Sequence, residues 1–234
     1  MLEHLSQALF PNHCAGCESP IANNGRFGFC DSCYELLSPN NGPRCGICDA
    51  PGLPQTCKRC LDTPPAFERL WAPYLFGGPL QQAIHRIKFA KEEFWLHGLA
   101  ELLCANEHIQ AIKEHCTHIV PVPLGKQRLK TRGFNQSAVL ARKIAQIWQK
   151  KPHYILERTR ETAPQSGLSQ EERESNMADA FKADAQNPVE NILLIDDVVT
   201  TGATLKSAAQ SLKKAGIQRV YALTLAHSDP HITK

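Results

Sequence analysis

Four Cys-x-x-Cys units crowd into the first 60 residues of this 234-residue chain, and they limit what that segment can fold into. Such a unit turns two sulfur atoms to one side of a knuckle, and two knuckles together supply the four ligands of a tetrahedral Zn²⁺ site. Pairing the units in sequence order gives two compact sites without threading the chain, and we prefer it to a cross-braced pairing. The predicted zinc ligands are Cys14, Cys17, Cys30, Cys33, Cys45, Cys48, Cys57 and Cys60.

Closed, all-thiolate sites indicate structural zinc, because a catalytic zinc usually keeps one coordination position open. This segment has few large apolar residues, so we expect the two metal ions to supply its folding energy. An iron–sulfur cluster and a redox-active dithiol are the alternatives. Cys104 and Cys116 lie outside the pattern, and we interpret them as small buried residues.

Cysteine usage also bears on location, because clustered thiols in a reducing compartment bind metal more often than they form disulfides. The first ten residues lack the basic start and long apolar core of a signal peptide. No apolar stretch reaches the roughly 18 residues that a membrane helix needs. We therefore expect a cytoplasmic protein with no membrane span.

The composition changes near Asp62–Pro65, where two consecutive prolines favour a linker. This divides the chain into a zinc-binding (double zinc ribbon) domain at residues 1–65 and a second domain at residues 66–234. Apolar periodicity in the second part predicts helices at 80–87, 94–113, 135–149 and 204–215, and strands at 118–123, 191–195 and 219–226. Residues 157–178 are polar and predict a loop with a helical piece. Strands that alternate with helices predict an α/β domain with a mainly parallel sheet flanked by helices.

The segment from Asn191 to Leu205 carries the strongest chemical signal. An apolar strand ends in Asp196 and Asp197, and a hydroxyl-rich turn containing Gly202 leads into a helix. Ligands of open α/β sheets bind at the carboxyl ends of strands, and backbone N–H groups at a helix N-terminus suit phosphate. The two carboxylates can accept hydrogen bonds from vicinal sugar hydroxyls. The alternative is a polar strand end followed by an ordinary capped helix.

This segment resembles the ribose-phosphate signature of type I phosphoribosyltransferases. Together with the cysteine units, Val122-Pro123-Leu124 and Arg132-Gly133-Phe134-Asn135-Gln136, it makes the chain similar to ComF-family (ComFC-type) competence proteins over essentially its whole length. The resemblance implies a type I phosphoribosyltransferase-like domain behind an N-terminal double zinc ribbon. It also implies a link to the uptake or processing of single-stranded DNA in natural transformation.

The resemblance implies a role for each part of the site. Asp196 and Asp197 would contact the ribose hydroxyls of 5-phosphoribosyl diphosphate (PRPP) or a nucleotide, directly or through Mg²⁺. The 5′-phosphate would lie against Thr200, Thr201, Gly202, Ala203 and Thr204. Pro123–Lys126 is placed at the pyrophosphate. The segment 158–176, with Gln165 and Arg173, is placed near the mobile catalytic loop.

Ten basic residues and one acid, Glu157, lie between Lys126 and Arg160. Phe134, Trp148 and Tyr154 are interleaved with them, and basic grooves with aromatic surfaces hold single strands without sequence readout. A solvated helix face with Trp148 in the core is the alternative, and Arg132 and Asn135 could be no more than a helix N-terminus. The predicted residues for pyrophosphate or DNA are Lys126, Arg128, Lys130, Arg132 and Asn135.

Three functions compete. The first is a DNA-handling protein that binds PRPP or a nucleotide 5′-phosphate and single-stranded DNA. The second is an active phosphoribosyltransferase on an unidentified acceptor. The third is a sensor of PRPP or nucleotides that signals to a protein such as a competence helicase through the zinc module.

Overall fold

The fold is described from a computed structural model that covers residues 12–21, 25–52, 55–161, 172, 176–177, 179–184 and 190–228. Four parallel strands form its central sheet, in the order β3 (Arg69–Trp71), β10 (Arg219–Leu223), β8 (Asn191–Ile195) and β5 (His118–Pro121). After short breaks the first three strands continue and pair again in the same order, as β4 (Tyr74–Leu75), β11 (Ala226–His227) and β9 (Val198–Val199). The predicted α/β class with a mainly parallel sheet is confirmed.

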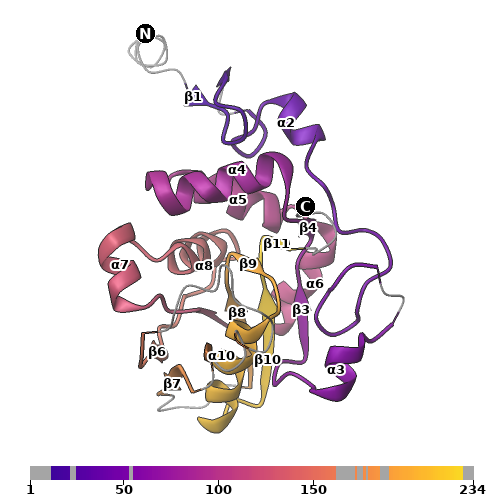
Figure 1. The fold of residues 1–234 in the computed structure, drawn as a ribbon, viewed down its shortest axis with the longest axis vertical. Helices are drawn as coiled ribbons and strands as arrows, with labels where there is room; N and C mark the ends of the chain where they lie inside the picture. Colours follow the sequence, from indigo (N-terminus) through magenta and orange to yellow (C-terminus); the bar gives the residue numbers. More distant parts are fainter. Residues whose placement is uncertain are drawn as a thin grey trace.

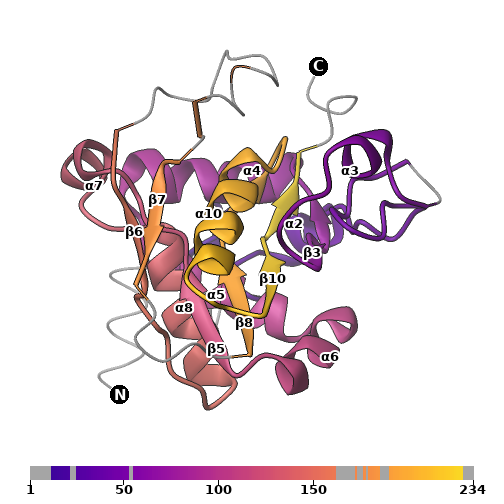
Figure 2. The ribbon, with the colours of Figure 1, turned by 90° about the horizontal axis from the view of Figure 1, so that it is seen from below.

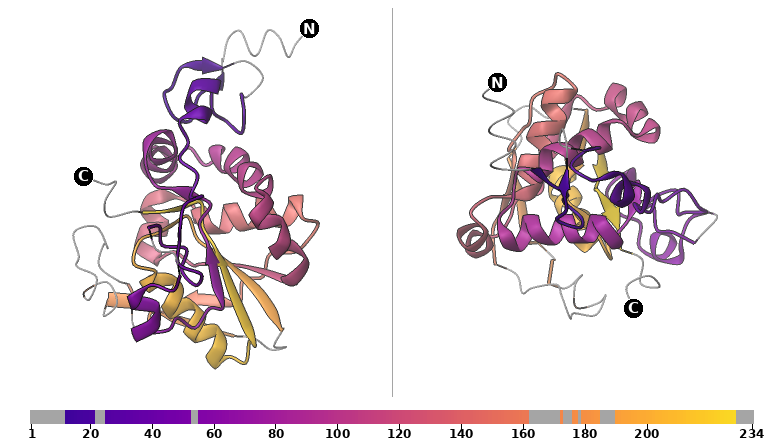
Figure 3. Two further views of the ribbon diagram at one scale, coloured as in Figure 1. Left: turned by 90° about the vertical axis from the view of Figure 1, so that its right-hand side faces the viewer. Right: turned by 90° about the horizontal axis from the view of Figure 1, so that it is seen from above.

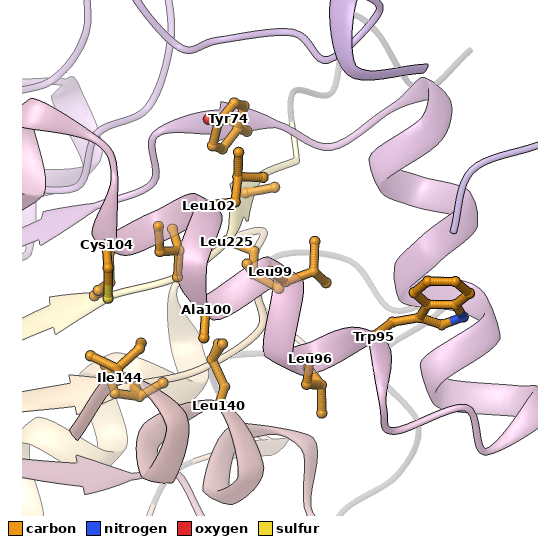
Figure 4. Close-up of a cluster of buried hydrophobic side chains, with 14 of the residues drawn as sticks. Tyr74, Trp95, Leu96, Leu99, Ala100, Leu102, Cys104, Leu140, Ile144 and Leu225 are labelled. Atoms are coloured by element: carbon orange, nitrogen blue, oxygen red, sulfur yellow. The ribbon is translucent and has the colours of Figure 1, made fainter. Parts of the chain in front are cut away.

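Both faces of the sheet are covered, as the unbroken apolar run of β8 predicts. Leu193 and Ile195 belong to the buried cluster formed with helices α5 (Trp95–Cys104) and α8 (Gln136–Ile147). Ile192 and Leu194 alternate with them and join α10 (Ala203–Lys214) on the other face. Figure 4 shows side chains of α5 directed towards Leu140 and Ile144 of α8.

The remaining elements surround this sheet (Figure 1). Helix α4 (Gly78–His85) runs directly into a π-helical turn, η1 (Arg86–Ala90), and α6 (Glu107–His115) leads into β5. Helix α7 (Lys126–Arg132) follows β5, and β6 (Leu156–Arg158) pairs antiparallel with β7 (Phe181–Ala183), as Figure 2 shows. Among the described ranges, every helix is too short or too polar to span a lipid bilayer.

The structure differs from three of the element ranges predicted from the sequence. The helix predicted at 94–113 is two helices, because Asn106 adopts an extended conformation and its side chain accepts a hydrogen bond from the His108 N–H at 3.1 Å. The strand predicted at 219–226 is interrupted between β10 and β11. The polar stretch 157–178 contributes to β6, and much of the rest lies outside the described residues.

The N-terminal double zinc ribbon forms two lobes that contact different parts of the body (Figures 1 and 3). The first lobe holds β1 (Asn12–His13), β2 (Pro20–Ile21) and α2 (Asp31–Glu35), and the second holds α3 (Lys58–Asp62). The first packs on α4 and α5 so closely that a Cβ atom at Gly98 would lie 2.3 Å from the Phe27 carbonyl oxygen. The second covers the edge of β3, where the Leu70 N–H donates to the Ile47 carbonyl at 2.8 Å. The proposed domain boundary at residue 65 remains a prediction.

Candidate functional site

A cavity of about 970 Å³ opens at the carboxyl ends of β5 and β8, where the sequence predicted a ligand. Asp196 and Asp197 enter it from the end of β8, and α7 and the start of α8 form the wall beyond β5. η1 contributes a further side. The charged and polar residues of its lining include Lys88, Lys91, Gln127, Arg128, Thr131, Arg132, Asn135, Gln136, Ser137, Arg158, Glu161, Asp196, Asp197, Thr200, Thr204 and Ser228.

The two carboxylates are held by separate sets of donors. Asp196 Oδ1 accepts hydrogen bonds from Ser137 Oγ at 2.8 Å and from the Asp197 N–H at 2.9 Å. Asp197 is buried, and its Oδ1 accepts from the Val198 N–H at 2.8 Å. Its Oδ2 pairs with Lys88 Nζ at 2.6 Å. The acid pair is therefore fixed in position before any ligand arrives.

Asp196 is poised to change its charge near neutral pH. Burial of the carboxyl and the neighbouring Asp197 carboxylate raise its pKa from an ordinary 3.8 to about 7. The Ser137 hydroxyl, the Asp197 amide and the Lys88 ammonium act in the opposite direction. A ligand that donates hydrogen bonds or brings a cation favours the ionised form, so binding and deprotonation are coupled here.

The turn after the acid pair presents the start of α10 to the cavity. Gly202 has φ +79°, a left-handed conformation that glycine adopts without strain, and it is the N-cap of α10. A Cβ atom there would lie 3.8 Å from the Val199 side chain, an ordinary contact, so the backbone conformation and not a lack of space calls for glycine. Thr200 and Thr204 line the cavity, whereas Thr201 Oγ1 accepts from the Ala203 N–H at 3.3 Å.

Three arginine side chains also line the cavity, and we call Arg128, Arg132 and Arg158 the arginine wall. Arg128 and Arg132 come from α7, and Arg158 comes from β6. Arg132 Nη1 donates to Gln136 Oε1 at 2.5 Å, and Gln136 Nε2 reaches Asp197 Oδ2 at 3.4 Å. Burial lowers the pKa of Arg132 below its ordinary value, although the nearby acid pair acts in the opposite direction. A cavity lined by both carboxylates and arginines suits a ligand that carries both hydroxyl and phosphate groups.

Two groups of four cysteine sulfur atoms lie outside this cavity. Within each group the sulfur atoms lie within 4.8 Å of one another, and the groups follow the sequential pairing: Cys14, Cys17, Cys30 and Cys33, then Cys45, Cys48, Cys57 and Cys60. Backbone N–H groups of Cys30 and Cys57 approach the sulfur atoms of Cys14 and Cys45 at 3.3 Å. Four convergent thiols with amide donors fit a closed structural Zn²⁺ site in each lobe.

Comparison with known protein families supports the predicted type of both parts of the chain. Residues 5–63 match the double zinc ribbon domain, and residues 129–233 match the phosphoribosyl transferase domain. Competence protein F of Haemophilus influenzae is 32% identical over 230 residues, which cover 92% of this chain and 96% of that protein. This chain belongs to the ComF family.

Two other relatives also align with most of this chain. The DNA utilization protein YhgH of Escherichia coli is 32% identical over 223 residues, covering 90% of this chain and 94% of that protein. Competence protein ComFC of Bacillus subtilis is 27% identical over 196 residues, covering 80% of this chain and 78% of that protein.

The structure brings together part of the residue set predicted from the ComF resemblance and from the basic stretch. Asp196, Asp197, Thr200 and Thr204 share the cavity with Arg128, Arg132 and Asn135. Thr201, Gly202 and Ala203 shape the turn, while Lys126 and Lys130 are exposed and do not line the cavity. Asn135 also caps α8, and its Nδ2 donates to the Val122 carbonyl at 2.9 Å. Gln165 and Arg173 lie outside the described residues.

Several contributors to this ComF-family site were not predicted. Gln136 is the last residue of the Arg-Gly-Phe-Asn-Gln motif and Ser137 follows it, so that motif could have pointed to both. Lys88 extends the predicted helix by one residue, and only the three-dimensional fold brings it to Asp197. Phe89, the next residue, lines the cavity and is 77% exposed.

Proposed function

We propose that this ComF-family protein binds a 5-phosphoribosyl ligand, either PRPP or a nucleotide 5′-phosphate, together with single-stranded DNA, and acts in DNA uptake during natural transformation. The observation that carries the proposal is the placement of the Asp196–Asp197 pair and the Arg128–Arg132 wall in one cavity. A cytoplasmic location, where thiols stay reduced, suits the eight cysteine ligands.

Each part of the ligand has a chemically suitable partner in the cavity. The ribose hydroxyls would donate to Asp196 and Asp197, and the 5′-phosphate would lie at the start of α10 beside Thr200 and Thr204. A diphosphate at C1 would face the guanidinium groups of α7, which match phosphate oxygens well. Mg²⁺ would enter with PRPP, because phosphate and carboxylate oxygens are its preferred ligands.

The DNA part of the proposal rests on the charge of the wall and on the relatives. Arg128, Arg132 and Arg158 place three guanidinium groups in the lining of one open cavity. The relatives are a DNA utilization protein and competence proteins, which is the context expected for a DNA strand at this surface.

A fluorescence anisotropy titration of labelled single-stranded DNA, at 50 and 200 mM salt and with or without Mg-PRPP, tests this proposal. If each of the three arginines neutralises one phosphate, the affinity falls roughly 20-fold between these salt concentrations. Arg132→Ala then weakens binding and lowers the slope of log affinity against log salt by about 0.7. Arg142→Ala, an exposed arginine on α8 that does not line the cavity, is the matched control.

The expected result is salt-sensitive binding that shifts when Mg-PRPP is added. Binding that is indifferent to salt, or that falls equally in the Arg132 and Arg142 variants, would count against DNA at this wall. DNA binding without any effect of Mg-PRPP would separate the DNA surface from the acid-pair cavity.

The second candidate is an active phosphoribosyltransferase. It is favoured by the presence of both groups in one cavity, because the acid pair would hold the sugar while the arginine wall receives the departing diphosphate. Preorganised donors of this kind lower the barrier for charge that develops in the transition state. Release of pyrophosphate from Mg-PRPP with one member of a nucleobase panel supports this candidate, and no release with any base argues for a binding role.

A sensor that acts through the zinc module is the third candidate. Arg86, in the same η1 turn as Lys88, donates to the Cys14 carbonyl at 3.4 Å and pairs with Glu18 at 2.7 Å. Ligand-dependent capture of a competence helicase by the full-length, zinc-loaded protein would support it, and capture that PRPP leaves unchanged would not.

A further inference from the structure

Phe89 stands out because it is a large apolar side chain exposed at a charged cavity. It is 77% exposed, although it lines the same cavity as the acid pair and the arginine wall. Exposed single apolar residues are common on protein surfaces, but an aromatic ring at the mouth of a phosphate-type cavity also offers a stacking surface.

Phe89 belongs to a short series of rings. His85 lies 5.8 Å from it with the ring planes at 81°, an edge-to-face arrangement. The Phe76 ring lies 6.0 Å from that of His85, and Phe76 also lines the cavity. The His85–Phe89 pair therefore has the edge-to-face geometry that aromatic rings prefer, which helps to hold Phe89 in place.

The backbone that carries Phe89 is held from several sides. Ile87 is buried in the main apolar cluster. Arg86 pairs with Glu18 at 2.7 Å and with Glu92 at 3.7 Å. Lys88 is bound to Asp197 in the cavity. A π-helical turn of this kind is often found at functional sites, and its anchors make Phe89 a positioned platform.

The η1 turn links Phe89 to the acid pair. Lys88 reaches the acid pair that is proposed to hold the ribose, and Phe89 is its direct neighbour in the chain. Both residues belong to η1 and line the same cavity, so a single turn supplies a contact to the acid pair and an exposed aromatic ring. Lys91, also in the lining, adds positive charge beside the ring.

The aromatic residues expected to stack bases lie elsewhere. Trp148 is buried in the core and Phe134 is partly buried against it. Tyr154 is exposed but does not line the cavity. In the described lining the aromatic rings are those of Phe76 and Phe89.

We infer that Phe89 stacks on the nucleobase of a nucleoside 5′-phosphate whose sugar lies at the acid pair, either as a free nucleotide or as the 5′-end of a DNA strand. This inference rests on the proposed phosphoribosyl ligand of the same cavity and names its base-binding element. Stacking of this kind tolerates different bases, since every base has a π-face.

Calorimetric titrations with ribose 5-phosphate, AMP and a 5′-phosphorylated oligodeoxyadenylate test the inference on the zinc-loaded, full-length protein. Phe89→Ala should weaken AMP or oligonucleotide binding by roughly 5- to 150-fold and leave ribose 5-phosphate binding unchanged. Phe89→Trp should keep the affinity and show fluorescence quenching by AMP but not by ribose 5-phosphate. Phe94→Ala is the matched control, because Phe94 is 62% exposed on the same connection but lies outside the cavity lining.

The outcomes are distinguishable. If Phe89→Ala loses affinity for AMP, Phe89 stacks on the base of free nucleotides. If it loses affinity for the oligonucleotide alone, Phe89 stacks on the base at a DNA end. Both results support stacking at Phe89. If ribose 5-phosphate binds but Phe89→Ala leaves both nucleotide probes unaffected, or weakens all three probes equally, the inference is wrong. If the unmodified protein binds none of the probes, the proposed function itself fails.

Discussion

Replacing Asp196 with asparagine should stabilise the protein at alkaline pH, although it removes a charge proposed to hold the ligand. The folded protein raises the pKa of Asp196 to about 7, so folding favours the protonated carboxyl. The raised pKa of Asp196 stabilises the folded protein fully when the pH is below the ordinary pKa near 3.8. This contribution is lost as the pH rises to about 7. Each tenfold change in proton affinity corresponds to about 1.4 kcal/mol, which gives an upper limit of about 4 kcal/mol.

Asparagine escapes this loss because it carries no charge at any pH, and its side-chain oxygen can still accept from Ser137. Some hydrogen-bond strength is lost with the charge, so we expect Asp196→Asn to be more stable than the unmodified protein by about 2–3 kcal/mol at pH 8. The advantage should shrink steadily between pH 7 and pH 5. This is the expected exchange of stability for function at a preorganised charged site.

Urea denaturation of both proteins at pH 5.5 and pH 8, followed by circular dichroism with zinc present throughout, measures the difference. Asp184→Asn is the control, because Asp184 is an exposed aspartate away from the cavity, and its replacement should change stability little at either pH. An Asp196→Asn protein that is no more stable than the original at pH 8, or a stability difference that does not vary with pH, would refute the reasoning.

Three further predictions follow from the same contacts. Lys88→Met leaves the buried Asp197 without its cation and should lower the free energy of unfolding by about 2 kcal/mol in urea denaturation. This is less than the roughly 3–5 kcal/mol seen for fully buried pairs, because the Lys88 side chain is 22% exposed. Lys88→Arg should recover part of the loss. Gly202→Ala should lower the free energy of unfolding by about 1–2 kcal/mol in the same assay, because alanine is strained at φ near +79° even though its Cβ atom has room there. An unchanged free energy of unfolding would contradict this. Removing zinc with a chelator should unfold both lobes and lower the melting temperature of the whole protein, since Cys14 and Phe29 share a buried cluster with α4 and α5, and metal analysis should first find two zinc ions per chain.

The sequence anticipated the parts of this molecule in which local chemistry decides the structure. The Cys-x-x-Cys units form the two predicted four-cysteine groups, because closely spaced ligands can meet without help from the rest of the fold. The strand at 191–195 and the acid pair at its end are also as predicted, because an apolar run followed by acids has few other places in an α/β fold. Trp148 lies in the core, which was the alternative prediction for it.

What could not be predicted depends on long-range packing. Lys88 reaches Asp197 across more than one hundred residues of sequence, and nothing local to either residue indicates the pair. The break at Asn106 was missed because the apolar periodicity continues on both sides of it. Lys126 and Lys130 share a helix with Arg128 and Arg132 but do not line the cavity, a distinction that a count of basic residues cannot make.

The most direct test of the central proposal is isothermal titration calorimetry of Mg-PRPP against the zinc-loaded protein and its Asp196→Asn/Asp197→Asn variant. We predict one binding site per chain in the unmodified protein. Each carboxylate that accepts from a sugar hydroxyl is worth about 1.5–3 kcal/mol, so the double variant should lose at least about 100-fold in affinity. The absence of binding by the unmodified protein, or equal affinity in the folded double variant, would contradict a phosphoribosyl ligand at this acid pair.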